Sequence, residues 1–200
     1  MKVTIWSLQM TRPPGPPPRP LPAGVRLERA TGVPAEYARF LYGLVGGDWY
    51  WTERLGWSRQ QWLDELAVPG TEFWIAYGEG VPLGYVQLQP VAGPGGSHVE
   101  IRYFGLAAQA IGRGLGGRLL EHGIAAAWSL PDRAGLAPAA RVWVHTCSLD
   151  GPAALANYQA RGLTVYAEEV TDEPVPASTP GSWAATGGPG DVTAGDRNRN

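Results

Sequence analysis

Residues 99–120 of this chain combine a strand-like stretch, a loop with four glycines in six positions and the start of a helix. The glycines are Gly112, Gly114, Gly116 and Gly117. Because glycine has no side chain, the backbone can come close to a ligand, and the helix directs its unpaired N–H groups to the same place. These donors and the positive end of the helix dipole stabilise an anion. The segment predicts a pyrophosphate-binding loop, with an ordinary glycine-rich turn as the alternative.

A dinucleotide-binding fold is a second interpretation of the same glycines. Gly112, Gly114 and Gly117 satisfy its pattern G-x-G-x-x-G. That fold requires a second strand that ends in an acidic residue about 20 residues later. Here residues 131–135 have the composition of a loop, and three consecutive strand-like segments precede the glycines. Consecutive strands indicate a meander, so the context argues against a dinucleotide site.

In this context the glycine loop resembles the pyrophosphate-binding motif of the GNAT superfamily of acetyl-CoA-dependent N-acetyltransferases. The motif falls on residues 111–116, which places Ile111 where the family usually has Arg or Gln; a second register would begin at Gln109. A second segment, residues 146–163, resembles the family's strand and short helix that carries a tyrosine, followed by glycine and an apolar residue. Tyr158, Gly162 and Leu163 keep that spacing, whereas Gly151 stands where the family often has Asn. The resemblance covers residues 24–170 and is greatest to small bacterial acetyltransferases of unassigned substrate.

The resemblance implies an α+β fold, the GNAT fold, in which a mixed central β-sheet with splayed strands is flanked by about four helices. It also implies acetyl-CoA as co-substrate and no metal. The residues it assigns to cofactor binding are Phe104, Gly105, Leu106, Ile111, Gly112, Arg113, Gly114, Leu115, Gly116 and Gly117. Among these, backbone N–H groups near Gly105 and Leu106 are expected to stabilise the thioester oxygen.

Acetyl transfer to an amine needs a base for the ammonium proton and an acid for the departing thiolate. Glu100 lies at the position where the histone acetyltransferase branch of the family keeps its general base; alternatively, it is a surface residue that pairs with Arg102. Tyr158 is the family's usual general acid, and a tyrosine with a pKa of ~10 is protonated at neutral pH. The alternative for Tyr158 is a packing role.

The acceptor is expected to bind near the aromatic residues 48–57, because the family usually shapes its acceptor pocket in this region. Trp49, Trp51 and Glu53 are the candidates, since aromatic faces with a nearby acid suit a cationic amine. Aromatic residues at this density also pack cores, which is the alternative. The three histidines, His98, His122 and His145, show no metal-ligand spacing, so structural roles are expected for them.

Composition indicates one globular domain flanked by segments that do not belong to its core. A hydrophobic content of 44% is sufficient for a core, and a net charge of −2 gives no nucleic-acid footprint. The single cysteine, Cys147, is expected to be a buried thiol in a reducing cytoplasm. No apolar run reaches the ~20 residues of a membrane helix, and residues 1–10 do not have the pattern of a signal peptide. The expected organisation is an N-terminal strand (1–10), a proline-rich polyproline II linker (11–23), the acetyltransferase domain (24–170) and a disordered tail (171–200).

Hydrophobic periodicity and turn residues predict the elements of the central domain. Ser58 and Gln61 have the spacing of a capping box at the start of one helix. The order is strand, two helices, three strands, helix, strand, helix and strand. The predicted strands are 24–30, 71–77, 83–89, 98–106, 141–147 and 163–170, and the predicted helices are 34–45, 58–66, 113–130 and 152–161.

Two classes of function follow. The first is an N-acetyltransferase that acts on a primary amine of a small molecule or a peptide, with Glu100 as general base and Tyr158 as general acid. The second is a non-catalytic acyl-CoA-binding module with a regulatory role, which Ile111 and Gly151 favour. Acylation with a longer chain and assembly as a homodimer remain open, and neither nucleic acid nor membrane is an expected partner.

Overall fold

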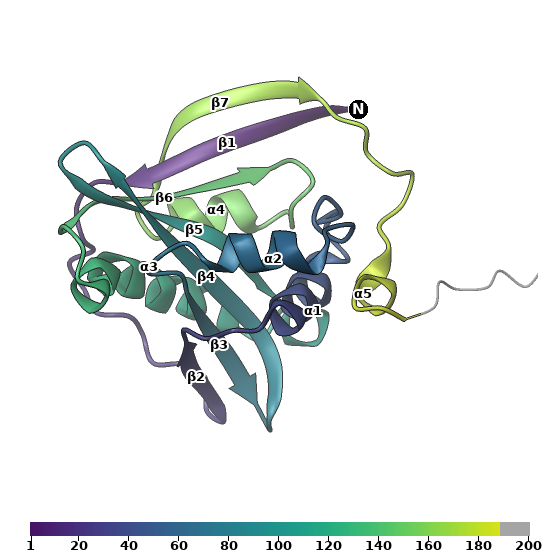
Figure 1. Cartoon of the computed structure of the whole chain (residues 1–200), viewed down its shortest axis with the longest axis horizontal. Coiled ribbons are helices and arrows are strands. Elements are labelled where there is room, and N and C mark those ends of the chain that lie inside the picture. Colours follow the sequence, from purple (N-terminus) through teal and green to yellow (C-terminus); the bar gives the residue numbers. More distant parts are fainter. Residues whose placement is uncertain (189–200) are drawn as a thin grey trace, which may run out of the picture.

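The computed structural model describes residues 1–188, and within them seven strands form one mixed sheet (Figure 1). The strand order is β2-β3-β4-β5-β6-β1-β7. Neighbouring strands are antiparallel except β5 and β6, which are parallel. The strands are β1 (Lys2–Met10), β2 (Val25–Ala30), β3 (Glu72–Gly78), β4 (Val81–Gly93), β5 (Gly96–Leu106), β6 (Ala139–Cys147) and β7 (Thr164–Asp172).

Helices cover both faces of the sheet, which confirms the α+β class. The helices are α1 (Ala35–Gly46), α2 (Arg59–Leu66), the 3-10 turn η1 (Ala108–Ala110), α3 (Leu115–Ala134), α4 (Ala154–Gln159) and α5 (Gly181–Ala185). Because side chains alternate across a strand, neighbours on β4 enter different cores. Val86 packs in the core that contains α3 and α4 residues, whereas Tyr85 packs in the core that contains α1 residues and Trp62 of α2.

Local sequence signals account for the helix ends near the site. Ser58 and Gln61 form the predicted capping box: the Ser58 side chain accepts from the Gln61 N–H, and the Gln61 side chain accepts from the Ser58 N–H. Helix α3 begins after Gly114 and ends before Gly135, and both glycines adopt the left-handed conformation. The apolar face of α3 buries Leu119 and Ile124 as the periodicity predicts.

The first strand lies inside the sheet rather than beside it. β1 pairs with β6 on one side and with β7 on the other, and Leu8 is fully buried in the α3 core. The proline-rich segment (residues 11–23) then crosses α3, where Arg19 forms an ion pair with Glu121 and Arg118 donates to the Pro20 carbonyl. The expected linker thus lies against the domain surface.

The end of the described chain differs from the disordered tail that its composition suggested. β7 extends to Asp172, and α5 packs beside α1 (Figure 1). The close approach is allowed by Gly43, where a Cβ atom would lie 2.6 Å from the Ala185 carbonyl oxygen. The remainder of the predicted tail, 189–200, lies outside the described residues.

Candidate active site

The two central strands, β5 and β6, diverge in the middle of the sheet. Their pairing extends only from Ser97 and Ala139 to Glu100 and Trp143, although β5 continues to Leu106 and β6 to Cys147. We call this divergence the splay. Beyond it, β5 leads through the glycine loop into α3, and β6 leads into α4. The splay therefore opens a gap in the sheet between the ends that carry these two helices.

The glycine loop presents an uncapped helix N-terminus. Gly112 (φ +80°) and Gly114 (φ +70°) occupy the left-handed region that favours glycine, and a Cβ atom at either position would meet no atom within 4 Å. Gly114 is the N-cap of α3; no side chain caps it, and the first turn has no acidic residue. The first N–H groups of α3 are therefore available to an anion.

The other two glycines of the loop have packing roles. A Cβ atom at Gly116 would lie 3.4 Å from Leu106, and one at Gly117 would overlap the guanidinium of Arg161. Arg161 donates from Nε to the Gly117 carbonyl oxygen at 3.1 Å. Gly117 thus lets a cation from the segment after α4 lie against the first turn of α3. Of the remaining predicted loop residues, Leu115 is buried, whereas Ile111 and Arg113 are exposed.

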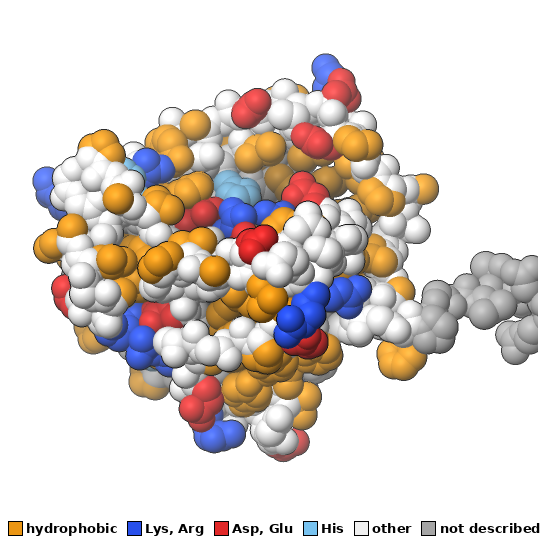
Figure 2. Space-filling model, in the orientation of Figure 1, with side chains coloured by type: hydrophobic (Ala, Val, Ile, Leu, Met, Phe, Trp, Pro, Cys, Tyr) orange, Lys and Arg blue, Asp and Glu red, His pale blue; other side chains and the backbone are white. Residues whose placement is uncertain are grey.

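Glu100 lies at the apex of the splay with a basic residue on each side. Its Oε1 is 3.5 Å from Nδ1 of His145 on β6 and 3.4 Å from Nη1 of Arg102, which also pairs with Glu65 of α2 at 2.8 Å. Burial by itself would raise the pKa of Glu100, but His145 and Arg102 stabilise the carboxylate and hold its pKa below the usual value. Figure 2 shows histidine, basic and acidic side chains gathered in a hollow between the upper strands and α2.

Tyr158 lies on the opposite face of the sheet. It belongs to the α3 core, and its ring meets that of Phe104 on β5 edge to face at 5.9 Å. Burial, with a smaller contribution from Asp150, raises the pKa of Tyr158 far above its ordinary value, so the hydroxyl keeps its proton at any physiological pH. Tyr158, on the helix that follows β6, thus contacts the part of β5 that has diverged from β6.

The end of β5 packs tightly against α1. A Cβ atom at Gly105 would lie 2.4 Å from Val45, so only glycine lets the helix come this close. The Ala107 N–H donates to the Leu83 carbonyl oxygen on β4 at 2.9 Å. Since consecutive strand residues direct their N–H groups to opposite sides, the Leu106 N–H is directed toward the splay.

The aromatic loop (residues 48–57) reaches the end of the β6 arm. The Trp51 indole donates to Asp150 at 3.1 Å, and the Trp49 ring lies 3.6 Å from the position of a Cβ atom at Gly151. Trp51 also packs against Tyr42 and Tyr103 in the α1 core, as the packing alternative predicts. Glu53 is 81% exposed and pairs with Arg54. The structure brings the two tryptophans to the mouth of the splay, and Glu53 faces solvent.

Sequence reasoning missed three residues of this region, His145, Asp150 and Arg161. A structural role was expected for His145, yet it contacts Glu100. The register between β5 and β6 explains this contact. Glu100 pairs with Trp143, and His145 lies two residues farther along β6, so its side chain points to the same face. Asp150 fixes the turn after β6 by accepting from the Thr146 hydroxyl at 2.6 Å and the Cys147 N–H at 3.0 Å.

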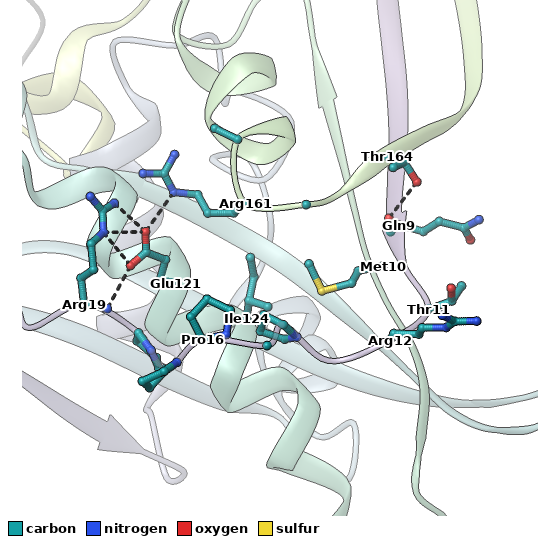
Figure 3. A pocket seen from close by; sticks show the side chains of 16 residues that line it. Gln9, Met10, Thr11, Arg12, Pro16, Arg19, Glu121, Ile124, Arg161 and Thr164 are labelled. Carbon is teal, nitrogen blue, oxygen red and sulfur yellow. Dashed lines mark hydrogen bonds and ion pairs between the residues drawn. The ribbon is translucent and has the colours of Figure 1, made fainter.

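A cavity of about 730 Å³ lies apart from the splay, between the proline-rich segment, the end of β1, α3 and residues 160–164 (Figure 3). Its wall includes Met10 and Ile124, and the Arg19, Glu121 and Arg161 side chains lie together at one side. None of the sequence-predicted site residues lines it. The cavity therefore does not define the candidate active site.

Residues 1–188 lack two features that other functional classes require. No cluster of three or more His, Cys, Asp or Glu side chains there is arranged to hold a metal ion. No helix in this range is long and apolar enough to cross a membrane.

Comparison with known proteins places this geometry among acetyltransferases. Residues 37–163 match the model of the acetyltransferase (GNAT) family. A GCN5-related N-acetyltransferase from Sphaerobacter thermophilus has a similar structure, with a TM-score of 0.55 at 20% identity over 84% of this chain and 50% of that one. A tandem GNAT protein from the clavulanic acid biosynthesis pathway has a TM-score of 0.58 at 18% identity, over 84% of this chain and 51% of that one. This chain thus spans about half the length of these two proteins.

A third similar structure is a GCN5-related N-acetyltransferase from Kribbella flavida. Its TM-score is 0.53 at 19% identity, over 84% of this chain and 58% of that one. At these identities the likeness establishes the fold alone. No curated protein matches this sequence significantly.

Proposed function

Since this chain belongs to the GNAT acetyltransferase family, we propose that it transfers the acetyl group of acetyl-CoA to a primary amine of a small molecule or a peptide. The observation that carries this proposal is the splay. Its gap lies between the uncapped start of α3 on one arm and Tyr158 on the other, with Glu100 at its apex. A thioester that reaches this gap would have the proton donor Tyr158 on one face of the sheet and the proton acceptor Glu100 on the other.

The residues present fit the anionic end of coenzyme A. The first N–H groups of α3, after Gly114, have no side-chain cap, and Gly112 and Gly114 leave the space around the backbone open. Arg113 is exposed beside them. We assign the pyrophosphate to this loop, where helix dipole and N–H donors act together, and Ile111 contributes through its backbone.

Acetyl-CoA supplies an activated acetyl group, and the chain supplies proton transfer and charge stabilisation. In the proposed reaction Glu100 accepts the proton of the substrate ammonium, so that a neutral amine attacks directly. The Leu106 N–H, which is directed toward the splay, would stabilise the charge that the carbonyl oxygen gains. Tyr158, protonated and on the opposite face, donates to the departing thiolate.

The acceptor is proposed to enter on the α2 face of the sheet. Glu65 and Glu100 provide negative charge there, although Arg102 neutralises part of it. Trp49 and Trp51 lie at the mouth of the splay and offer aromatic surface to a cationic amine. An amine with a modest apolar body suits this combination.

An acceptor screen tests the proposal. Purified protein is incubated with acetyl-CoA and a panel of small-molecule and peptide amines, and products are detected by mass spectrometry together with released coenzyme A. We expect an acetylated amine and one free coenzyme A for each acetyl group transferred. Tight acetyl-CoA binding without any acetylated amine would instead support the non-catalytic acyl-CoA-binding alternative.

A further inference from the structure

His145 contacts Glu100 from the other arm of the splay. Nδ1 of His145 lies 3.5 Å from Glu100 Oε1, and the two side chains differ sharply in exposure: 48% for His145 against 10% for Glu100. The imidazole therefore lies between a nearly buried carboxylate and bulk water. Catalytic hydrogen bonds are often long before substrate binds, so this separation suits a proton transfer that tightens in the complex.

We propose that His145 relays the proton of the acceptor amine from Glu100 to bulk water. The inference rests on the proposed acetyltransferase function and deepens it. His145 acts through Glu100 and does not itself contact the amine, so it is a positioning and relay residue. Its second role is to hold the carboxylate toward the splay, together with Arg102.

The proton balance closes over one turnover. Glu100 takes one proton from the ammonium and becomes a neutral acid, and the amine becomes a neutral nucleophile. The acid passes that proton to Nδ1 of neutral His145, which becomes an imidazolium, and the imidazolium loses one proton to water. Glu100 is then a carboxylate and His145 neutral. The attacking nitrogen loses a second proton as the tetrahedral intermediate collapses, and that proton balances the one that Tyr158 gives to the thiolate. The cycle thus releases one net proton to water and returns all three side chains to their starting states.

Glu100 needs such an outlet because its own surroundings oppose fast exchange with solvent. Its side chain is nearly covered, and the Arg102 guanidinium favours its ionised form. Once Glu100 has taken a proton it therefore gives the proton up readily, and an adjacent neutral imidazole is a suitable acceptor.

The other groups around His145 leave this route clear. Its cross-strand neighbours, Ser7 on β1 and Ala167 beyond it on β7, carry no charge, and the Trp143 ring lies 6.3 Å away. The charged or titratable groups on this face include Glu100, Arg102 and Tyr103 of β5, Glu65 of α2, Arg141 and Cys147 of β6, and Tyr166 and Glu169 of β7.

Substitution of His145 tests the relay with an amine that the wild-type protein acetylates. H145Q keeps a polar group beside Glu100 but cannot carry a proton. We expect kcat/KM to fall about tenfold at pH 8, less than the ~10²-fold loss of a direct acid or base. Because only a neutral imidazole can take the proton from Glu100, the ratio of the wild-type rate to the H145Q rate should decrease toward one as the pH is lowered. In H145A, added imidazole should restore part of the lost kcat.

H98Q is the matched control. His98 lies on the same strand as Glu100, but its ring contacts the Pro94 carbonyl oxygen at 3.1 Å within the β4–β5 hairpin, so its rate should stay at the wild-type level. An active wild type with unchanged H145Q, or a loss that is equal at every pH and not rescued by imidazole, overturns the relay alone. A wild type that acetylates no amine in the panel overturns both the relay and the proposed function.

Discussion

Glu100 has a lowered pKa although its side chain is nearly buried. Its side chain is 10% exposed, and burial raises the pKa of a carboxyl group. Here the contacts with His145 and Arg102 outweigh that effect, so the net shift of the Glu100 pKa is downward. The pKa of Glu100 is thus set by desolvation, which raises it, and by two basic neighbours, which lower it.

This balance predicts how stability depends on pH. Because the folded-state pKa of Glu100 lies below the unfolded value of ~4.3, its contribution is fully present above that value and is lost as pH falls through the folded pKa. The unfolding free energy of the wild type, measured by urea denaturation, should therefore fall more between pH 6 and pH 3 than that of E100Q. E53Q, at a surface carboxyl that is 81% exposed, is the control and should follow the wild type. Parallel curves for wild type and E100Q would contradict the assignment.

Tyr158 allows a test of the proton donor with little change in packing. Y158F keeps the ring that meets Phe104, so the melting temperature should change little, whereas kcat should fall by about 10²-fold if the hydroxyl donates the proton. An acetyl donor whose thiolate is intrinsically more stable should recover part of the rate in Y158F and give the wild type a smaller gain. Equal impairment with both donors, or full activity with acetyl-CoA, would show that water supplies the proton.

At the scale of elements, the start of α3 is the proposed binding site for the pyrophosphate. Gly114 and Gly135 bracket this helix with nearly the same backbone, φ +70° and φ +66°, and a Cβ atom at either position would meet nothing within 4 Å. Valine at either position should cost about 1–2 kcal/mol, since a branched side chain is strained in this conformation. The two sites therefore form a matched pair that differs only in which end of α3 is changed.

G114V should lose coenzyme A binding, whereas G135V should retain it. The readout is thermal stabilisation by coenzyme A, which at 100 times the dissociation constant corresponds to about 2.7 kcal/mol. Valine at 114 blocks the approach to the first N–H groups of α3, and valine at 135 lies at the other end. Equal stabilisation of both variants would remove the pyrophosphate from the glycine loop.

Most elements were predictable because their signals are local. The capping box at Ser58, the αL glycine at the start of α3 and the period of β6 depend on neighbouring residues, and the order of elements from β2 to β7 agrees with the expectation. Helix α5 was not predictable, because it is held by a long-range contact with Gly43 and the surrounding composition is typical of disordered chain. The pairing of Glu100 with His145 likewise depends on the register of two strands that α3 separates in sequence.

At the scale of the whole molecule, the N-terminal strand is part of the domain that follows the proline-rich segment. The sequence predicts an N-terminal strand at residues 1–10 but not its partners, because pairing between distant strands is decided by tertiary packing. β1 fills the place between β6 and β7, and Leu8 is 0% exposed. The domain core is thus completed by residues from its beginning.

L8A should therefore destabilise the entire domain. Removal of a fully buried leucine side chain costs about 2–5 kcal/mol, and a urea titration followed by fluorescence would show one shifted transition. K2A, at an exposed position of the same strand, should change the unfolding free energy by less than ~0.5 kcal/mol. Identical stability of L8A and K2A would mean that the strand is a dispensable extension.

The position of β1 also has a consequence for the order in which the sheet forms. Translation produces β1 before its partners, which are residues 142–147 and 164–172, so its ladders join almost the two ends of the described chain. Contacts at such sequence separation raise the contact order and slow folding. During synthesis the hydrogen-bonding edges of β1 therefore stay without their native partners until β6 and β7 have left the ribosome.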